Sequence, residues 1–133
     1  MHIPSSISAL LGRTGELAAL LEQWCNVNSG SGHAAGLERM RIVLHAEFSR
    51  SFPAAAIDEP TTDAPGFNPS GTKALRLRMR PTAPVQVLFS GHYDTVYESD
   101  DPFQICRWTD ADTLNGPGGA DMKGGLVTML AAL

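Results

Sequence analysis

The chain has 133 residues, a length that suits one domain with a modest hydrophobic core. Hydrophobic residues make up 43% of it and charged residues 18%, which is typical of a folded globular protein and not of a disordered one. Ten Lys and Arg residues against fourteen Asp and Glu residues give a net charge of −4 with no basic stripe, so we expect no nucleic-acid partner.

The N-terminal half predicts two helices separated by a loop. The first begins after Thr14, a possible N-cap, and its apolar residues recur at helical spacing: Leu17, Leu20, Leu21 and Trp24. The segment "NSGSG", residues 28–32, is expected to be a loop because Gly and Ser favour turns and offer little packing. A second helix follows and ends before Pro53, with one apolar side: Leu37, Met40, Leu44 and Phe48.

The C-terminal half predicts strands and one further helix. After a loop over most of residues 58–72, "ALRLRMR" (74–80) alternates apolar and basic residues, as a strand with one wet face does. "VQVLF" (85–89) predicts a more buried, central strand, and "FQICRW" (103–108) a short third one. A glycine-rich loop, "NGPGGADMKGG" (115–125), leads into a helix marked by Leu126, Met129, Leu130 and Leu133.

Helices flanking a sheet predict an α/β layer architecture. In such sheets, binding sites gather at the carboxyl ends of the strands. The segment "SGHYDTV" (90–96) follows the predicted central strand, so we expect it to lie at such an edge.

The sequence gives no sign of a membrane protein. No apolar run approaches the ~18 residues needed to cross a bilayer. The N-terminus lacks a basic leader before an apolar core, so we expect no signal peptide and a cytoplasmic location. Cys25 and Cys106 have no C-x-x-C spacing, and reduced structural thiols are favoured over a disulfide.

His92 and Asp94 form the first candidate site. Side chains two residues apart point the same way in extended backbone, so the two should share a face. A carboxylate beside an imidazole can accept its second N–H, which suits a metal ligand with a supporting group. The alternative for a single H-x-D motif is a surface pair, or an Asp that begins a turn.

Asp121, in the glycine-rich loop, is the second candidate. Glycines let the backbone approach a bound ion and adopt positive φ, which would fix this carboxylate at the sheet edge. The alternative is a flexible turn with solvated Asp121 and Lys123 side chains. Phosphate-binding motifs do not fit: Gly124 stands where a P-loop has Ser or Thr, and Asp121 replaces the last glycine of G-x-G-x-x-G, which disfavours a free-standing nucleotide binder.

Together, "FSGHYDTV", "WTDADTLNG" and "LNGPGGADMKGG" resemble the zinc-dependent exopeptidase and deacylase family of glutamate carboxypeptidase, acetylornithine deacetylase and succinyl-diaminopimelate desuccinylase. The opening "LLEQWCNVNSGSGHAAGLERM" is similar to that family's first helix, Ser/Gly loop and second helix. The resemblance therefore covers nearly the whole chain. It implies that residues 1–133 are the N-terminal part of an α/β catalytic domain with a mixed sheet flanked by helices, without the rest of that domain or the dimerisation domain.

The resemblance also implies roles for individual residues. His92 would bind one zinc ion and Asp121 would bridge two, while Asp94, counted with the catalytic residues, would orient His92. Cobalt or manganese could replace zinc, because N and O ligands discriminate poorly among these metals. The bond between Asp121 and Met122 would be cis. The family's further ligands and general base, a Glu-Glu pair, another acidic residue and a late histidine, have no counterpart in this chain.

The implied function is a metal-dependent hydrolase of amide or peptide bonds next to a free carboxylate, acting on an N-acyl amino acid or a peptide. The complete protein would be a homodimer. Because this chain supplies two metal ligands, we expect it to be an incomplete, inactive fragment that binds zinc weakly. His33, His45 and the acidic residues Glu98, Asp100 and Asp101 are not expected to be ligands. The alternative is a non-enzymatic fold remnant or partner-binding module that keeps the scaffold.

Overall fold

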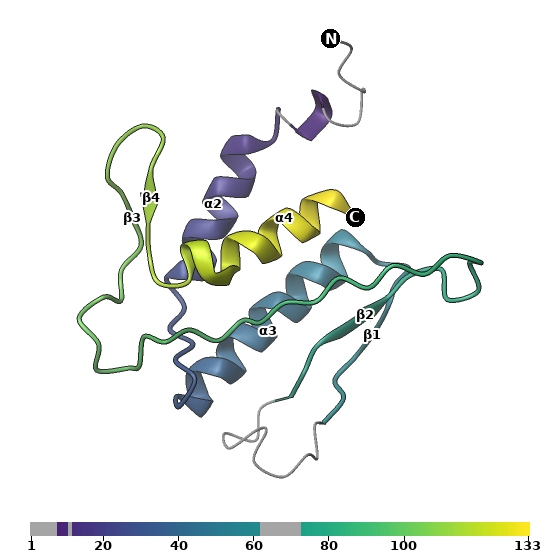
Figure 1. Ribbon diagram of the computed structural model, residues 1–133, viewed down its shortest axis with the longest axis horizontal. Coiled ribbons are helices and arrows are strands. Elements are labelled where there is room, and N and C mark those ends of the chain that lie inside the picture. Colours follow the sequence, from purple (N-terminus) through teal and green to yellow (C-terminus); the bar gives the residue numbers. More distant parts are fainter. Residues whose placement is uncertain (1–7, 11, 62–72) are drawn as a thin grey trace.

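The computed structural model describes residues 8–10, 12–61 and 73–133. Within these residues no helix is long and apolar enough to span a membrane. The chain forms helices, two small antiparallel sheets and one wide turn, η1 (Figure 1). In chain order these are α2 (Thr14–Cys25), α3 (Ala34–Ser51), β1 (Ala56–Asp58), β2 (Arg76–Arg78), β3 (Arg107–Trp108), β4 (Leu114–Asn115), η1 (Gly119–Lys123) and α4 (Gly124–Ala132).

The three predicted helices are confirmed, with one correction at the start of α2. Thr14 lies inside the helix as its first residue, and Arg13 occupies the N-cap position without a side-chain cap. Nε and Nη2 of Arg13 each donate to the carboxylate of Glu16 at 3.0 Å. A charge pair with a first-turn carboxylate, which also suits the helix dipole, therefore stands where a hydroxyl cap was expected.

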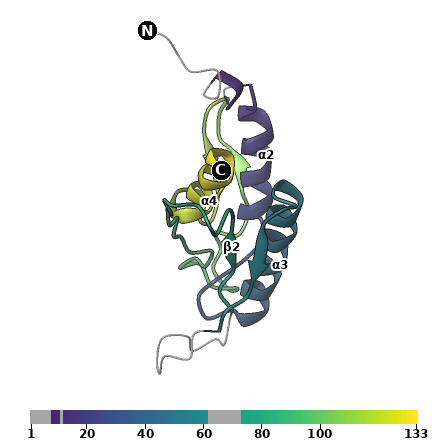
Figure 2. The same cartoon turned by 90° about the vertical axis from the view of Figure 1, so that its right-hand side faces the viewer.

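The core lies where the three helices meet. Trp24 and Met40 are fully buried, and Leu44 is 2% exposed. Leu126 and Val127 of α4 complete this cluster. Figure 1 shows α4 between α2 and α3, and the turned view in Figure 2 places α4 on one side of the pair α2 and α3. Apolar residues at helical spacing bring these faces together, because burying them removes apolar surface from water.

The strand predicted over residues 74–80 is confirmed at its centre. β2 pairs antiparallel with β1, with Ile57 opposite Leu77. Leu77 is partly buried while Arg76 and Arg78 are exposed, as the alternation predicts. Both arginines bond the carboxylate of Asp58, Arg76 at 2.7 Å and Arg78 at 3.3 Å. β1 was not predicted, and residues 62–72, most of the expected loop, lie outside the described part of the chain.

The predictions for residues 85–89 and for a mixed sheet were wrong. Val85, Val87 and Leu88 are 76%, 73% and 90% exposed, and no strand is formed there. In the described chain the sheets are two antiparallel strand pairs, β1–β2 and β3–β4, and only the isolated bridge Gly30–Thr95 is parallel. The physical reason is that a strand needs a neighbour, and among the described residues none pairs with 85–89.

The exposed apolar segment 85–89 should make the chain associate with itself. Unpaired backbone flanked by Val and Leu side chains is a template for edge-to-edge pairing. We expect a mass that rises with concentration in light scattering, and a smaller rise after Val87→Lys, which places a charge on the edge. A constant monomer mass over the whole concentration range would contradict this expectation.

Cys25 and Cys106 are free and buried, which confirms the prediction of reduced structural thiols. The two thiols influence each other electrostatically although they are distant in the sequence. Burial raises the pKa of Cys25 to about 12, with a further rise from Cys106 that nearby Lys123 partly opposes. Because the thiolate is the reactive form, these cysteines should be inert in the folded protein.

Alkylation should measure this inertness directly. A rise of the Cys25 pKa from 9.0 to about 12 lowers the thiolate fraction at neutral pH by about a thousandfold. The rate of iodoacetamide labelling should therefore be at least that much lower in the folded chain than in urea. The labelling rate of the folded chain should also keep rising, by about tenfold per pH unit, above the ordinary thiol pKa. The labelling rate of an unperturbed thiol no longer rises in that pH range. Peptide mass spectrometry separates Cys25 from Cys106, and equal rates with and without urea would disprove the prediction.

Candidate metal-binding site

The Ser/Gly loop between α2 and α3 fixes the segment that carries His92. Ser29 accepts the backbone N–H of Thr95 on its carbonyl oxygen at 2.8 Å, and its hydroxyl donates to the carbonyl of Tyr93 at 2.7 Å. The N–H of Ser31 donates to the carbonyl of Thr95 at 2.9 Å. Ser29 and Thr95 are both buried. The loop thus replaces a neighbouring strand and holds residues 93–95 extended.

The other half of the site is the turn from Gly118 to Lys123. Gly118 has φ of 75°, a conformation that favours glycine, and its carbonyl accepts the N–H of Lys123 at 2.8 Å. Inside this turn Asp121 departs from helical geometry, with φ of −134° and ψ of 99°. The bond between Asp121 and Met122 is cis, as the resemblance implied. The turn thereby projects the Asp121 carboxylate out of the helix direction, and its side chain is 86% exposed.

Direct packing brings the two halves together. A Cβ on Gly91 would lie 2.7 Å from Cε of Met122 and 2.9 Å from a methyl carbon of Leu126. The backbone at residue 91 therefore rests on the residue after Asp121 and on α4, and a larger residue there would have to push these side chains aside. His92 follows directly and lies beside Asp121 for this reason.

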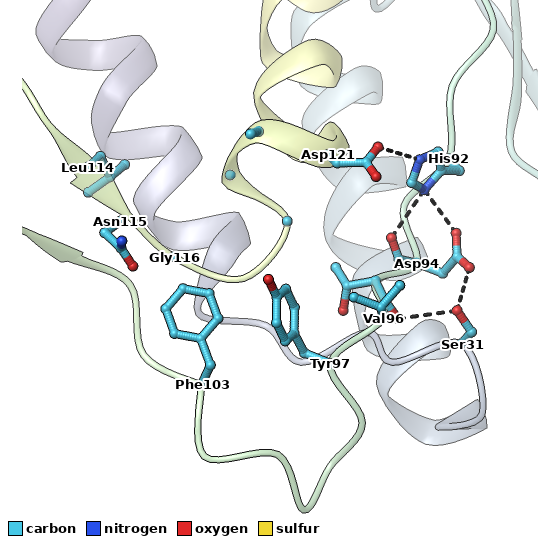
Figure 3. Close-up of a pocket in the computed structure, with 14 residues that line it drawn as sticks. Ser31, His92, Asp94, Val96, Tyr97, Phe103, Leu114, Asn115, Gly116 and Asp121 are labelled. Atoms are coloured by element: carbon cyan, nitrogen blue, oxygen red, sulfur yellow. Dashed lines mark hydrogen bonds and ion pairs between the residues drawn. The ribbon is translucent and has the colours of Figure 1, made fainter.

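His92 lies between two carboxylates (Figure 3). Its Nε2 is 3.0 Å from Oδ1 of Asp121, and its Nδ1 is 3.0 Å from Oδ1 of Asp94. Nδ1 also lies 3.1 Å from the backbone oxygen of Asp94. The predicted convergence of residues 92, 94 and 121 is thus present in the structure.

Electrostatics favour a positive charge at this position. Partial burial lowers the pKa of His92, but the hydrogen bond to Asp121 and the contacts with Asp94 outweigh it, so the pKa lies above its ordinary value. With Nδ1–H donating to Asp94, it is the proton on Nε2 that joins the ring to Asp121. A cation bound between these two atoms would take the place of that proton.

The pair His92 and Asp121 fits a divalent cation in donor type and in spacing. One imidazole nitrogen and one carboxylate oxygen are common zinc ligands. Two ligands of one tetrahedral zinc ion, each about 2.0–2.1 Å from the metal, lie roughly 3.3 Å apart. The observed separation of 3.0 Å between Nε2 and Oδ1 is within a few tenths of an ångström of that value. Asp94 on the opposite nitrogen holds the ring in the tautomer that a ligand needs.

Ser31 belongs to this arrangement and was missed by the sequence analysis. Its hydroxyl donates to Oδ2 of Asp94 at 2.7 Å, while Oδ1 of the same carboxylate faces His92. Asp94 is therefore fixed from both of its oxygens. The only sequence signal was the Ser/Gly loop itself, and nothing in it distinguished Ser31 from Ser29.

Replacing Ser31 by alanine should loosen Asp94 without unfolding the chain. The hydroxyl has two acceptors, exposed Oδ2 of Asp94 and the part-buried carbonyl of Thr95 at 3.1 Å, so the free energy of unfolding should fall by about 1 kcal/mol. The ring signals of His92 in NMR spectra should nevertheless change, because Asp94 then orients the ring less firmly. The control is Ser49→Ala. It removes an exposed hydroxyl from α3, away from His92, and should leave the ring signals of His92 unchanged.

A pocket of about 370 Å³ adjoins the pair His92 and Asp121. Away from His92 and the two carboxylates its lining carries no charged side chain: it consists of glycines of the 116–119 segment, apolar side chains and a few uncharged polar ones such as Asn115 (Figure 3). The rings of Tyr97 and Phe103 meet edge to face with centroids 4.9 Å apart. The hydroxyl of Thr95, another lining residue, is buried without a hydrogen-bond partner among the described residues. The pocket can therefore take an apolar group beside a polar one.

The other polar residues near the site serve the loop. His33 Nδ1 lies 2.7 Å from Oδ1 of Asn28, and Glu98 accepts the N–H of Gly32 at 2.8 Å. Asp101 accepts the N–H of Phe103 at 2.7 Å. Across the described ranges, no three His, Cys, Asp or Glu side chains are grouped so as to hold a metal ion. A cation here would have two side-chain ligands from this part of the chain.

Comparison with known proteins finds a similarity for the C-terminal part of the chain, which carries the candidate site. The model of peptidase family M20/M25/M40 matches residues 88–133, a stretch that contains His92, Asp94 and Asp121. No curated protein and no solved structure matches the chain.

Proposed function

On the premise that residues 88–133 are a segment of peptidase family M20/M25/M40, we propose that this protein is a zinc-dependent hydrolase. Its substrate would carry an amide or peptide bond next to a free carboxylate, as in an N-acyl amino acid or a dipeptide. The observation that carries the proposal is the 3.0 Å approach of His92 Nε2 to Asp121 Oδ1 on the wall of a pocket.

Each residue of the site has a role in this proposal. His92 Nε2 and Asp121 Oδ1 would hold the cation, and Asp94 would accept the Nδ1 proton and keep Nε2 free to bind. A bound zinc ion would supply Lewis acidity toward the amide carbonyl. Ser31 would hold Asp94 in place by its hydrogen bond to Oδ2.

The pocket suggests how a substrate would lie. One neighbouring group would enter between the Tyr97–Phe103 pair and the glycine-rich 116–119 segment, where no charged side chain lines the wall. The amide would then be next to His92 and Asp121. Binding an apolar group there would bury aromatic surface that is partly exposed in the free chain.

The proposal requires more than the described residues supply. Both carboxylates of the site are engaged with His92, so neither is placed to take a proton from water. We therefore propose that residues 1–133 are part of a catalytic domain completed by further ligands and a general base. The cytoplasmic location, the homodimer and the choice of zinc over cobalt or manganese are parts of the same proposal.

Titration of zinc into the purified chain tests the proposal. We expect binding with a dissociation constant in the micromolar range or weaker, because two side-chain ligands compete poorly with water. Amide NMR signals of residues 91–95 and 119–123 should shift together along one binding curve. Zinc that shifts other residues, or none, would refute the proposal. Sub-micromolar binding or hydrolysis of N-acyl amino acids would show that further residues complete the site.

A further inference from the structure

Lys123 is a buried charge that the proposed function does not use. Its side chain is fully buried at the end of η1, directly before α4. Lysine is almost never fully buried unless it is paired. Among the described residues no carboxylate forms an ion pair with Lys123, so other groups must compensate its desolvation.

The compensation comes from the end of α2. Nζ of Lys123 donates to the backbone oxygen of Val27 at 2.8 Å and to that of Trp24 at 3.1 Å. Carbonyls at the C-terminus of a helix lack N–H partners within the helix and carry the negative end of its dipole. Lys123 therefore caps α2, the helix that contributes Trp24 to the core.

The same side chain holds the turn that carries Asp121. A Cβ on Gly118 would lie 3.1 Å from Cδ of Lys123 and 2.8 Å from Cγ2 of Thr95. Gly118 is thus wedged between Lys123 and Thr95, and Thr95 lies three residues after His92. The backbone N–H of Lys123 closes the turn on the Gly118 carbonyl. Lys123 thus contacts both the turn that carries Asp121 and Gly118, which in turn contacts Thr95 of the His92 segment.

We propose that Lys123 is a positioning residue that holds the Asp121 carboxylate against His92 by tying the 118–123 turn to the carbonyls of Trp24, in the last turn of α2, and Val27, two residues after the helix. The inference deepens the proposed function, because Asp121 is one of its two ligands. The contact between Asp121 and His92 can nevertheless be measured without any metal, so the two proposals can fail separately.

The test is a double-mutant cycle read from the ring ¹H and ¹⁵N signals of His92 at one fixed pH. Asp121→Asn alone should move these signals, because Nε2 loses its carboxylate partner. In a Lys123→Met chain the same replacement should move them at least about threefold less, since Asp121 is no longer held near the ring. Leu44→Val, which perturbs the core on α3, is the matched control and should keep the full effect of Asp121→Asn.

Each other outcome decides the question. A full effect of Asp121→Asn in the Lys123→Met chain would overturn the proposal, and so would the absence of any effect in the otherwise unchanged chain. If Lys123→Met does not fold, Lys123→Gln is measured in the same way; its side chain is too short to reach both carbonyls, so the effect of Asp121→Asn should again fall, and a full effect would again overturn the proposal. If neither folds while Leu44→Val does, Lys123 serves folding in general and the positioning role is rejected. Absence of zinc binding with the coupling intact would reject the proposed function alone.

Discussion

Asp121→Asn should weaken zinc binding by more than about tenfold while leaving the free energy of unfolding almost unchanged. The replacement keeps the shape of the side chain but removes the anionic oxygen that lies 3.0 Å from His92 Nε2. With one of two side-chain ligands gone, the imidazole alone must hold the cation against water. Stability should barely change because the Asp121 side chain is 86% exposed. Calorimetric zinc titration and urea unfolding measure the two quantities.

The matched control for this variant is Asp100→Asn. It removes the same charge from an exposed carboxylate four residues after the stretch 90–96 that carries His92 and Asp94. If zinc were attracted only by the general negative charge of −4, both variants would weaken binding equally. Equal losses would therefore contradict the assignment of Asp121 as a ligand, whereas a loss confined to Asp121→Asn would support it.

Trp24→Ala should destabilise the chain by about 3–5 kcal/mol, a large part of the roughly 5–15 kcal/mol by which a domain of this kind is stable. Trp24 is fully buried and packs with Met40, Leu44 and the α4 residues of the core. Its removal leaves a cavity where the three helices meet, and the surrounding side chains can fill it only in part. Urea unfolding followed by circular dichroism measures the loss.

Trp108→Ala provides the same substitution at the surface. Trp108 is 45% exposed, and its Nε1 donates to Glu22 at 3.2 Å in an exposed hydrogen bond. Its loss should cost about 1 kcal/mol or less. Similar losses for the two tryptophans would show that the helices do not pack as described.

The sequence predicted the helices because their signal is local. Apolar residues at helical spacing identify α2 and α3, and the structure buries Trp24, Met40 and Leu44 as that spacing requires. The alternation of residues 74–80 was equally local, and the exposed and half-buried sides of β2 follow it. The predicted N-cap, Thr14, was wrong by one residue, because Thr14 and Arg13 are both chemically able to serve the first turn.

The sequence could not show that the predicted central strand is absent, because a strand depends on its neighbours. "VQVLF" has the composition of a buried strand, yet Val87 and Leu88 are exposed since no described segment pairs with them. β1 and β4 were not predicted at all, and β3 covers only the last two residues of the strand predicted over 103–108. Two or three residues contain no period that a sequence pattern can reveal.

By itself the sequence predicted the candidate residues of the site: His92 and Asp94 two residues apart, and Asp121 within a glycine-rich turn. These follow from local spacing, and their resemblance to a metallopeptidase family is confirmed over residues 88–133. Only the tertiary structure decided that His92 and Asp121 approach to 3.0 Å, that Ser31 holds Asp94, and that Lys123 caps α2. These contacts join residues 29 to 99 positions apart in the chain, and no local pattern determines which distant groups packing will bring together.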